Sequence, residues 1–533
     1  MIFGVEALIA GGLAIFGWKP SAAFPREPTE TLRHLAAPGS DLSRNHALLL
    51  LAVASALGVV LRTHRIGLDL WLDEIATVVA YSARPLLEIF GSYQSPGNHL
   101  LNSLLVRLST SAFGESEWSV RLAAVVFGVA TIPLMYWAGR LAMSRAASVG
   151  AALLLAVSYH HIFFSQNARG YTAHLFSVLA SSALLASALR KDHLLKWVAY
   201  VLAMTLGFAA LMTTAFTLAG HMVVGAIALI AAQRRGAPLL PLAGRLFAAF
   251  GATGLLALQV YAVSIPDVIA VYPTVYGSEA SGYALLSREF ASQLMRGVSA
   301  GFALGFAAIP LIAVAFAGFV VLMRRNWVLA LSLFLSVGIT VLYLLVRGQT
   351  IVPRLMLPGL PLAILSCMAT IEATTQLLAR RGVFSRLKPA VVSLAIAVLL
   401  SGVSLLALPR YYSAPKQPYR SAIRHLEKVR GEDNVFVIFP GVGGFRYYLG
   451  RESVSDTAAY HYVSSVPEYA AALDSIGAAD AFLTTTLFRV MRTSTPDLAE
   501  RIEREWVPVR QFRGTLGDGT ITVWRRRSAS SGG

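Results

Sequence analysis

Long runs of apolar residues recur along most of this chain, and they limit its possible folds more than any other feature. A helix needs about 20 mainly apolar residues to cross the hydrocarbon core of a bilayer, although shorter spans are tolerated. Only 14% of the 533 residues are charged, whereas soluble domains carry roughly 25%. The sequence therefore predicts a polytopic α-helical membrane protein.

About eleven of these runs suit a membrane span by length and composition. They are His46–Leu61, Ser119–Leu141, Ala146–Val157, Tyr171–Leu189, Trp197–Met212, Ala215–Ala232, Arg245–Ser264, Val298–Met323, Trp327–Val346, Leu355–Ala379 and Ala390–Leu408. Ile2–Trp18 is also apolar apart from Glu6, and either an extra span or an interfacial helix fits it. No basic region precedes it, which argues against a signal peptide.

The basic residues indicate which side of the membrane each connection faces. They cluster in alternate connections: Arg140–Arg145, Arg190–Lys196, Arg234–Arg235, Arg324–Arg325 and Arg380–Lys388. The positive-inside rule places these connections in the cytoplasm, so the others face outward. This topology accounts for the net charge of +17, which is therefore no sign of nucleic-acid binding.

The composition changes near Pro409, where a second kind of domain begins. The pattern predicts helices at Gln417–Arg430 and Pro496–Trp506, strands at Asn434–Phe439 and Ala479–Thr484, and a hairpin of Val507–Phe512 with Thr520–Trp524. Gly441-Val442-Gly443-Gly444 lacks the Lys and the spacing of a phosphate loop, so we expect an ordinary turn. The predicted domains are a segment at 1–44 with a possible helix and a cytoplasmic linker, a membrane domain at 45–408, an extracytoplasmic α/β domain at 409–525 and a disordered tail at 526–533.

Two adjacent carboxylates, Asp73 and Glu74, follow the first confident span in the segment Leu68–Glu74. Charges beside a membrane are costly unless they serve a site or a pathway. One interpretation makes Asp73 a catalytic base with Glu74 as its neighbour. The alternative is a structural pair that caps a short helix, because acidic residues are favoured in first helical turns.

The other outward connections also carry polar residues that a simple connector does not need. They include Asn98 and His99 in Ser95–His99, then His160, His161, Gln166, Arg169 and Tyr171, and later Arg347 and Arg354. All lie on the predicted outer face, so we expect them to converge with Asp73 on one cavity. The single cysteine, Cys367, excludes an internal disulfide and a cysteine-based metal site.

Sugar transfer from a polyprenyl phosphate requires such a set of residues. A carboxylate must take the proton of a hydroxyl as it attacks, which suits Asp73. Guanidinium groups hold phosphate oxygens, which suits Arg169 and Arg354, with Arg347 as a further candidate. The alternative for these arginines is anchoring to lipid headgroups.

The remaining polar residues are candidates for substrate binding. His99, Asn98, Gln166 and Tyr171 are predicted to bind substrate, although His99 could instead cap a short helix. His160 and His161 are better explained as interfacial residues than as metal ligands. We therefore predict no metal site and no certain cofactor, although a divalent cation requirement stays open.

Four motifs in order resemble those of the GT-C membrane glycosyltransferases, in the group of bacterial protein O-mannosyltransferases and the lipid A aminoarabinose transferase. They are Trp71–Glu74, Ser95–Leu101, Phe113–Leu122 and Ser165–Tyr171. The resemblance covers roughly residues 46–190 and returns near Arg354–Pro358. Asn167 replaces the usual acid of the last motif, and no Pro follows His99.

The resemblance implies a GT-C fold with an inverting transfer of a sugar from a polyprenyl-phosphate donor to an acceptor hydroxyl. It places the enzyme in the bacterial inner membrane, with the active site and the C-terminal domain on the periplasmic side. The catalytic Asp of the family carries over to Asp73 and its Glu partner to Glu74. The implied partners are the lipid-linked donor, membrane lipids and a protein, lipid or polysaccharide acceptor.

Two other functions stay open as alternatives. A transporter or flippase of a lipid-linked sugar would usually show inverted repeats and charges in mid-span, and the sequence shows neither. A subunit that only binds a lipid-linked glycan is the third possibility. The long connection Ile265–Arg296 is predicted either to gate the acceptor or to be a flexible loop.

Overall fold

The computed structural model of the chain describes residues 41–276, apart from 92, 94 and 96, and residues 308–527, apart from 348–352, 384–386, 453, 455, 477–480, 516 and 517. The predictions for Ile2–Trp18, for residues 277–296 of the long connection and for nearly all of the tail lie outside these residues. The chain divides into two compact units, each described by itself.

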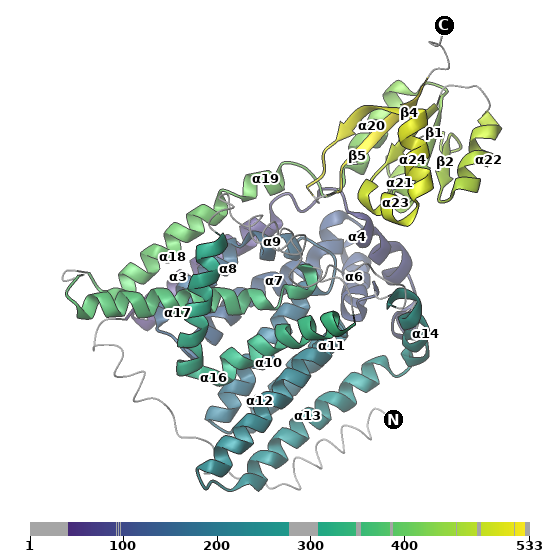
Figure 1. The fold of residues 1–533 in the computed structure, drawn as a ribbon. Helices are drawn as coiled ribbons and strands as arrows, with labels where there is room; N and C mark the ends of the chain where they lie inside the picture. The colour runs from purple at the N-terminus through teal and green to yellow at the C-terminus, as the bar shows by residue number, and fades with distance from the viewer. Residues whose placement is uncertain are drawn as a thin grey trace. The chain divides into compact units, whose positions relative to one another are not determined.

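The first unit, here the helical unit, comprises Met1–His64, Arg84–Ser109 and Arg121–Ala407. Its helices, or the helices that run into it, are α3 (Arg44–Thr63), α5 (Leu86–Gly91), α6 (Leu100–Phe113), α7 (Glu117–Arg140), α8 (Arg145–Val157), α9 (Tyr159–Ser165), α10 (Tyr171–Arg190), α11 (Leu194–Ala210), α12 (Thr214–Arg234), α13 (Leu239–Tyr261), α14 (Ile265–Tyr276), α16 (Ala308–Val346), η3 (Pro353–Met356), α17 (Gly359–Arg380) and α18 (Pro389–Leu405) (Figure 1).

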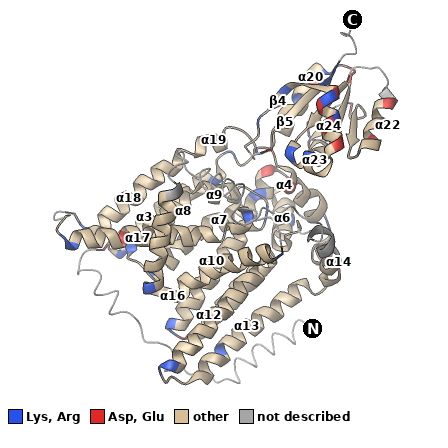
Figure 2. Cartoon of the chain, in the orientation of Figure 1, with Lys and Arg blue, Asp and Glu red and all other residues tan. Residues whose placement is uncertain are grey.

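Within the described residues, eight helices are long and apolar enough to cross a membrane, or nine if the bent pair α8 and α9 forms one span. The prediction of a multi-pass helical protein is thereby confirmed. Basic residues occupy the last turns of α10, α12 and α17, at Arg190, Arg234 and Arg380. Figure 2 shows most of the spans without charge and the blue residues gathered at helix ends.

Two details of the predicted spans change in the structure. The predicted outward connection Tyr159–Gly170 is not all loop, because Tyr159–Ser165 forms α9, bent by 56° from α8. The bend falls at Ser158, whose hydroxyl caps α9 by accepting from the His161 N–H at 3.5 Å. The predicted spans that meet at residues 324–326 are joined within α16, which is broken by the non-helical backbone of Asn326.

Burial separates the helices of the core from those that face lipid. Most residues of α10 are buried, including Leu175, Leu179 and Leu185, so this helix belongs to the core. In contrast, α13 exposes large apolar side chains such as Phe247 and Leu258, which suits contact with hydrocarbon.

The second unit, here the mixed unit, comprises Arg65–Ala83, Thr110–Val120 and Leu408–Gly533. It contains α4 (Leu72–Ala76), η1 (Thr77–Ser82), α19 (Leu408–Tyr412), α20 (Tyr419–Val429), α21 (Val442–Leu449), α22 (Val466–Ile476), α23 (Phe488–Ser494) and α24 (Pro496–Glu505). The first two segments fall in the predicted membrane domain 45–408, and that division of the chain stays a prediction.

A five-stranded sheet forms the centre of the mixed unit, in the order β2 (Tyr460–Val463), β1 (Asn434–Ile438), β3 (Ala481–Thr485), β5 (Ile521–Arg526) and β4 (Trp506–Phe512). β1 is parallel to β2 and β3, whereas β5 is antiparallel to β3 and β4. The predicted helices, strands and hairpin in this region are confirmed. β2, α22 and α23 were not predicted.

The glycine-rich stretch differs from the turn that its sequence suggests. Only Gly441 lies in a turn, whereas Val442, Gly443 and Gly444 begin α21. The reason is close packing, because a Cβ at Gly444 would lie 2.0 Å from Cζ of Tyr419 in α20. Gly444 therefore allows α21 to pack closely against α20.

Candidate functional site

Asp73 and Glu74 lie in the first turn of α4. Glu74 is fully buried, and its Oε2 accepts a hydrogen bond from the Trp71 N–H at 3.2 Å. It thus has the capping role weighed as the alternative, and its catalytic role stays a prediction. Asp73 is half-buried, and its backbone carbonyl accepts from the Thr77 hydroxyl at 3.0 Å.

The backbone that leads into α4 is held by the C-terminal part of the mixed unit. The Leu70 N–H donates to Tyr448 Oη at 2.6 Å, and the Leu72 N–H donates to Gln417 Oε1 at 2.8 Å. Sequence reasoning missed both partners. They lie more than 340 residues along the chain, and no local pattern connects them with the acidic segment Leu68–Glu74.

In the helical unit, two predicted site residues, Arg169 and Tyr171, lie against the imidazole ring of a third, His99. The Gly170 N–H donates to His99 Nδ1 at 2.8 Å, and Arg169 Nη2 lies 3.4 Å from His99 Nε2. The Tyr171 ring meets the His99 ring edge-on, with centroids 5.1 Å apart. We call His99, Arg169, Gly170 and Tyr171 the His99 cluster; His99, Arg169 and Tyr171 are buried.

The geometry explains why position 170 is a glycine. A Cβ there would lie 2.5 Å from the carbonyl oxygen of Ala210 and 3.2 Å from His99 Nδ1. The absence of a side chain at Gly170 lets its N–H reach the His99 ring. This contact holds the motif Ser165–Tyr171 in place at the start of α10.

The charge state of His99 follows from its surroundings. Burial lowers the pKa of His99 well below its usual value, and the positive charges of Arg169 and Arg354 lower this pKa further. The ring is therefore neutral near pH 7. Because Nδ1 accepts the shorter hydrogen bond, Nε2 carries the proton.

This tautomer leaves two donors facing each other. A guanidinium group has no acceptor, and the His99 Nε2–H is also a donor, so neither can accept from the other. A site with two converging donors, one of them the charged Arg169, and a second positive charge nearby on Arg354 is suited to an anion. Arg169 and Arg354 thus both act on His99 within the helical unit, and their role as phosphate ligands stays a prediction.

Two other predicted substrate residues make structural hydrogen bonds. Gln166 Nε2 donates to the carbonyl oxygens of Arg62 and His64 at 2.9 and 2.8 Å. Asn98 Oδ1 accepts from the Ser103 hydroxyl at 2.9 Å. These bonds hold the loops that carry the His99 cluster. Arg347 is exposed and directly follows the last residue of α16, Val346.

A buried arginine that the sequence analysis missed organises the bend before α9. Arg62 is fully buried and donates to the carbonyl oxygens of Leu155 and Ala156 at 3.2 and 2.8 Å. Its Nη2 also lies 2.6 Å from His161 Nδ1. His161 thus has an arginine as its partner, and among the described residues no group of three or more His, Cys, Asp or Glu could hold a metal ion.

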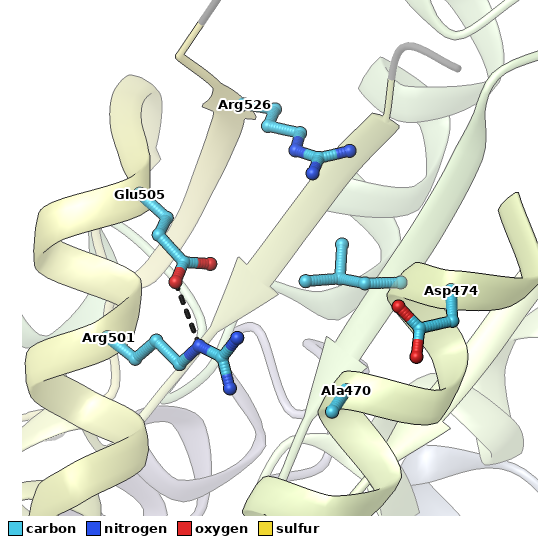
Figure 3. A pocket seen from close by; sticks show the side chains of 6 residues that line it. Ala470, Asp474, Arg501, Glu505 and Arg526 are labelled. Atoms are coloured by element: carbon cyan, nitrogen blue, oxygen red, sulfur yellow. Dashed lines mark hydrogen bonds and ion pairs between the residues drawn. The ribbon is translucent and has the colours of Figure 1, made fainter. Parts of the chain in front are cut away.

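A pocket of about 460 Å³ lies elsewhere in the mixed unit (Figure 3). It is lined by Ala470, Leu473, Asp474, Arg501, Glu505 and Arg526. Arg501 Nε donates to Glu505 Oε1 at 2.8 Å. The pocket contains no residue that the sequence analysis proposed. Asp73 and the His99 cluster belong to different units, so their convergence stays a prediction.

Comparisons with known proteins agree with this architecture. Residues 98–261 match the sequence model of the family described as dolichyl-phosphate-mannose-protein mannosyltransferase. The crystal structure of ArnT from Cupriavidus metallidurans bound to undecaprenyl phosphate matches with a TM-score of 0.51 and 15% identity over 92% of this chain and 100% of that chain. The apo ArnT structure matches with a TM-score of 0.52 and 14% identity, over 92% and 99% of the two chains. A search of curated protein sequences found no match.

Proposed function

We propose, from the premise that this chain is a multi-pass membrane protein with the fold of the GT-C glycosyltransferases, that it transfers a sugar from a polyprenyl-phosphate donor to an acceptor hydroxyl. The proposed site of the reaction is the periplasmic face of the bacterial inner membrane. The basic connections of the sequence support this orientation.

The observation that carries the proposal is the buried pair of donors at His99 and Arg169. The two groups lie 3.4 Å apart, and a second positive charge, that of Arg354, acts on the same neutral ring as the charge of Arg169. A phosphate oxygen accepts from both donors and neutralises the charge that they concentrate. The undecaprenyl phosphate bound by ArnT supports a lipid-linked phosphate as the ligand.

The proposed chemistry assigns the proton transfer to Asp73. Its carboxylate takes the acceptor hydroxyl proton as the oxygen forms a bond to the anomeric carbon. The bond between that carbon and the phosphate oxygen breaks, and the configuration inverts. The departing phosphate gains negative charge, which Arg169, Arg354 and the His99 N–H stabilise.

The experiment that tests the proposal compares Asp73→Asn with the parent protein in a transfer assay with a polyprenyl-phosphate sugar. We expect the transfer rate to fall about 10³-fold, because a general base typically contributes 10²–10⁴-fold to the rate and the Asn amide cannot take the proton. Donor binding should stay within about threefold, because the phosphate ligands are intact.

The arginines provide the complementary test. Arg169→Ala should weaken donor binding by tenfold or more, since a lost hydrogen bond to a charged group costs about 1.5–3 kcal/mol. Full transfer by a correctly inserted Asp73→Asn protein would reject Asp73 as the catalytic base. Absence of transfer by the correctly inserted parent protein would reject the enzyme and leave a transporter or a binding subunit. Unchanged donor affinity in Arg169→Ala would remove that residue from the phosphate site.

A further inference from the structure

Arg420, near the start of α20, binds the acidic segment through groups that the proposed reaction does not use. Its backbone N–H donates to Asp69 Oδ2 at 2.9 Å. Its guanidinium lies among three carboxylates: Nη1 is 3.6 Å from Asp69 Oδ1, Nε is 3.2 Å from Glu452 Oε1, and Nη2 donates to Glu117 Oε1. All four residues belong to the mixed unit.

These three carboxylates are largely buried, with side-chain exposures of 9% for Asp69, 13% for Glu117 and 11% for Glu452. Like charges that are close together and shielded from water repel one another strongly. The planar guanidinium can reach all three because it has five N–H donors in a fixed fork. Removing Arg420 leaves Asp69 and Glu117 without this shared cation.

Tyr448 extends the same network. The Arg420 guanidinium lies 4.8 Å from the centre of its ring. The Tyr448 hydroxyl accepts from the Leu70 N–H and donates to Glu117 Oε1 at 3.3 Å. Arg420 and Tyr448 therefore tie the acidic segment and the start of α7 to the same helices, α20 and α21.

The neighbouring Glu115 makes a second attachment of this kind. Its Oε1 accepts from the Tyr447 hydroxyl at 2.9 Å and from Arg451. The acids of the motif Phe113–Leu122 thus bind the C-terminal part of the mixed unit. This gives the motif a structural task that its sequence did not reveal.

We propose that Arg420 is a positioning residue for Asp73, an inference that rests on the proposed function. α4 has only five residues, and a helix of that length is not stable by itself. Its orientation therefore depends on the anchors at Asp69, Leu70 and Leu72. Displacing a reacting group by about 1 Å can cost 10²-fold in rate.

The test measures kcat and the donor KM of full-length Arg420→Ala and Arg424→Ala proteins. Arg424 is the matched control, because its side chain also binds Glu452, at 2.5 Å, but is 66% exposed and is not among the groups that bind Glu117. Arg420→Ala should lower kcat at least tenfold with the donor KM within about threefold, and Arg424→Ala should change neither by more than about twofold.

Two further variants keep the inference testable if Arg420→Ala does not fold. Arg420→Lys retains the charge but not the fork, so its kcat should fall between those of the alanine variant and the parent. The double variant Tyr448→Phe with Gln417→Met removes the side-chain acceptors of the Leu70 and Leu72 N–H groups. It should lower kcat with little change in the donor KM.

The outcomes separate this inference from the proposed function. Parental kcat in folded Arg420→Ala, or in the double variant if Arg420→Ala does not fold, would overturn the positioning role while a dead Asp73→Asn protein still upheld the enzyme. A rise of the donor KM by the same factor as the fall in kcat would also overturn it, because a positioning role predicts an effect on kcat alone. Full transfer by the Asp73→Asn protein would instead remove Asp73 as the base, and absence of transfer by the parent protein would reject the proposed function itself.

Discussion

One histidine tautomer decides what the His99 cluster can hold. The sequence placed His99, Arg169 and Arg354 on one face of the membrane from the alternation of basic connections alone. It could not foresee that the Gly170 N–H occupies His99 Nδ1, because residues 99 and 170 are far apart in the chain. That single contact turns the ring into a donor and makes the cluster suited to phosphate.

Two substitutions at His99 should separate its two nitrogens. His99→Asn retains an acceptor at the position of Nδ1 but loses the N–H group of Nε2. The KM for the lipid-linked sugar should therefore rise about tenfold. His99→Gln retains a donor at the position of Nε2 but leaves the Gly170 N–H unsatisfied, which should cost about 1–3 kcal/mol of stability with donor KM within about threefold.

Kinetics and thermal unfolding of the purified proteins provide the measurement. Equal donor KM for the two variants would show that the Nε2–H does not contact the donor. Unchanged stability of the Gln variant would show that the Gly170 contact contributes little.

Among the elements, the sequence predicted best where periodicity and turn signals agree. Val507–Phe512 and Thr520–Trp524 flank Asp518-Gly519, and the antiparallel register of β4 and β5 confirms the hairpin. α9 was missed because it is short and follows α8 after one residue, Ser158. The start of α21 was missed because glycines favour turns, and only the position of Tyr419 explains their presence in a helix.

Packing of α20 against α21 should be sensitive to any side chain at Gly444. A Cβ there would lie 2.0 Å from Tyr419 Cζ, and Tyr419 is fully buried. Gly444→Ala should therefore destabilise the protein by about 1–3 kcal/mol, as overpacking does in other cores.

The control is Gly450→Ala, at the end of α21, where nothing lies within 4 Å of an added Cβ. Thermal unfolding of both proteins in the same detergent checks this expectation. Equal midpoints would mean that the two helices can separate at no cost.

For the whole molecule, the sequence predicted a membrane protein and its sidedness from composition and charge. The fold class is confirmed, whereas the sidedness is still a proposal. The sequence could not predict which stretches of chain make up the mixed unit. The hydrogen-bond partners of Asp69, Leu70 and Leu72 come from residues after 408.

Cysteine labelling should test the orientation. In a Cys367→Ala background, Glu432→Cys should react with a membrane-impermeant maleimide in intact spheroplasts, because Glu432 is exposed in a turn of the mixed unit. Arg381→Cys, at the basic end of α17, should react only after permeabilisation. The reverse pattern would contradict a periplasmic site.

The mixed unit is built from three stretches of chain, Arg65–Ala83, Thr110–Val120 and Leu408–Gly533. One consequence concerns how such proteins can diverge or be recombined. A chimera that inherited only the last stretch from a distant homologue would lose the hydrogen bonds at Leu70 and Leu72 and the ion pairs at Asp69 and Glu117. A graft that keeps these contacts has to exchange all three stretches together, because the end of the chain holds the loop that bears Asp73.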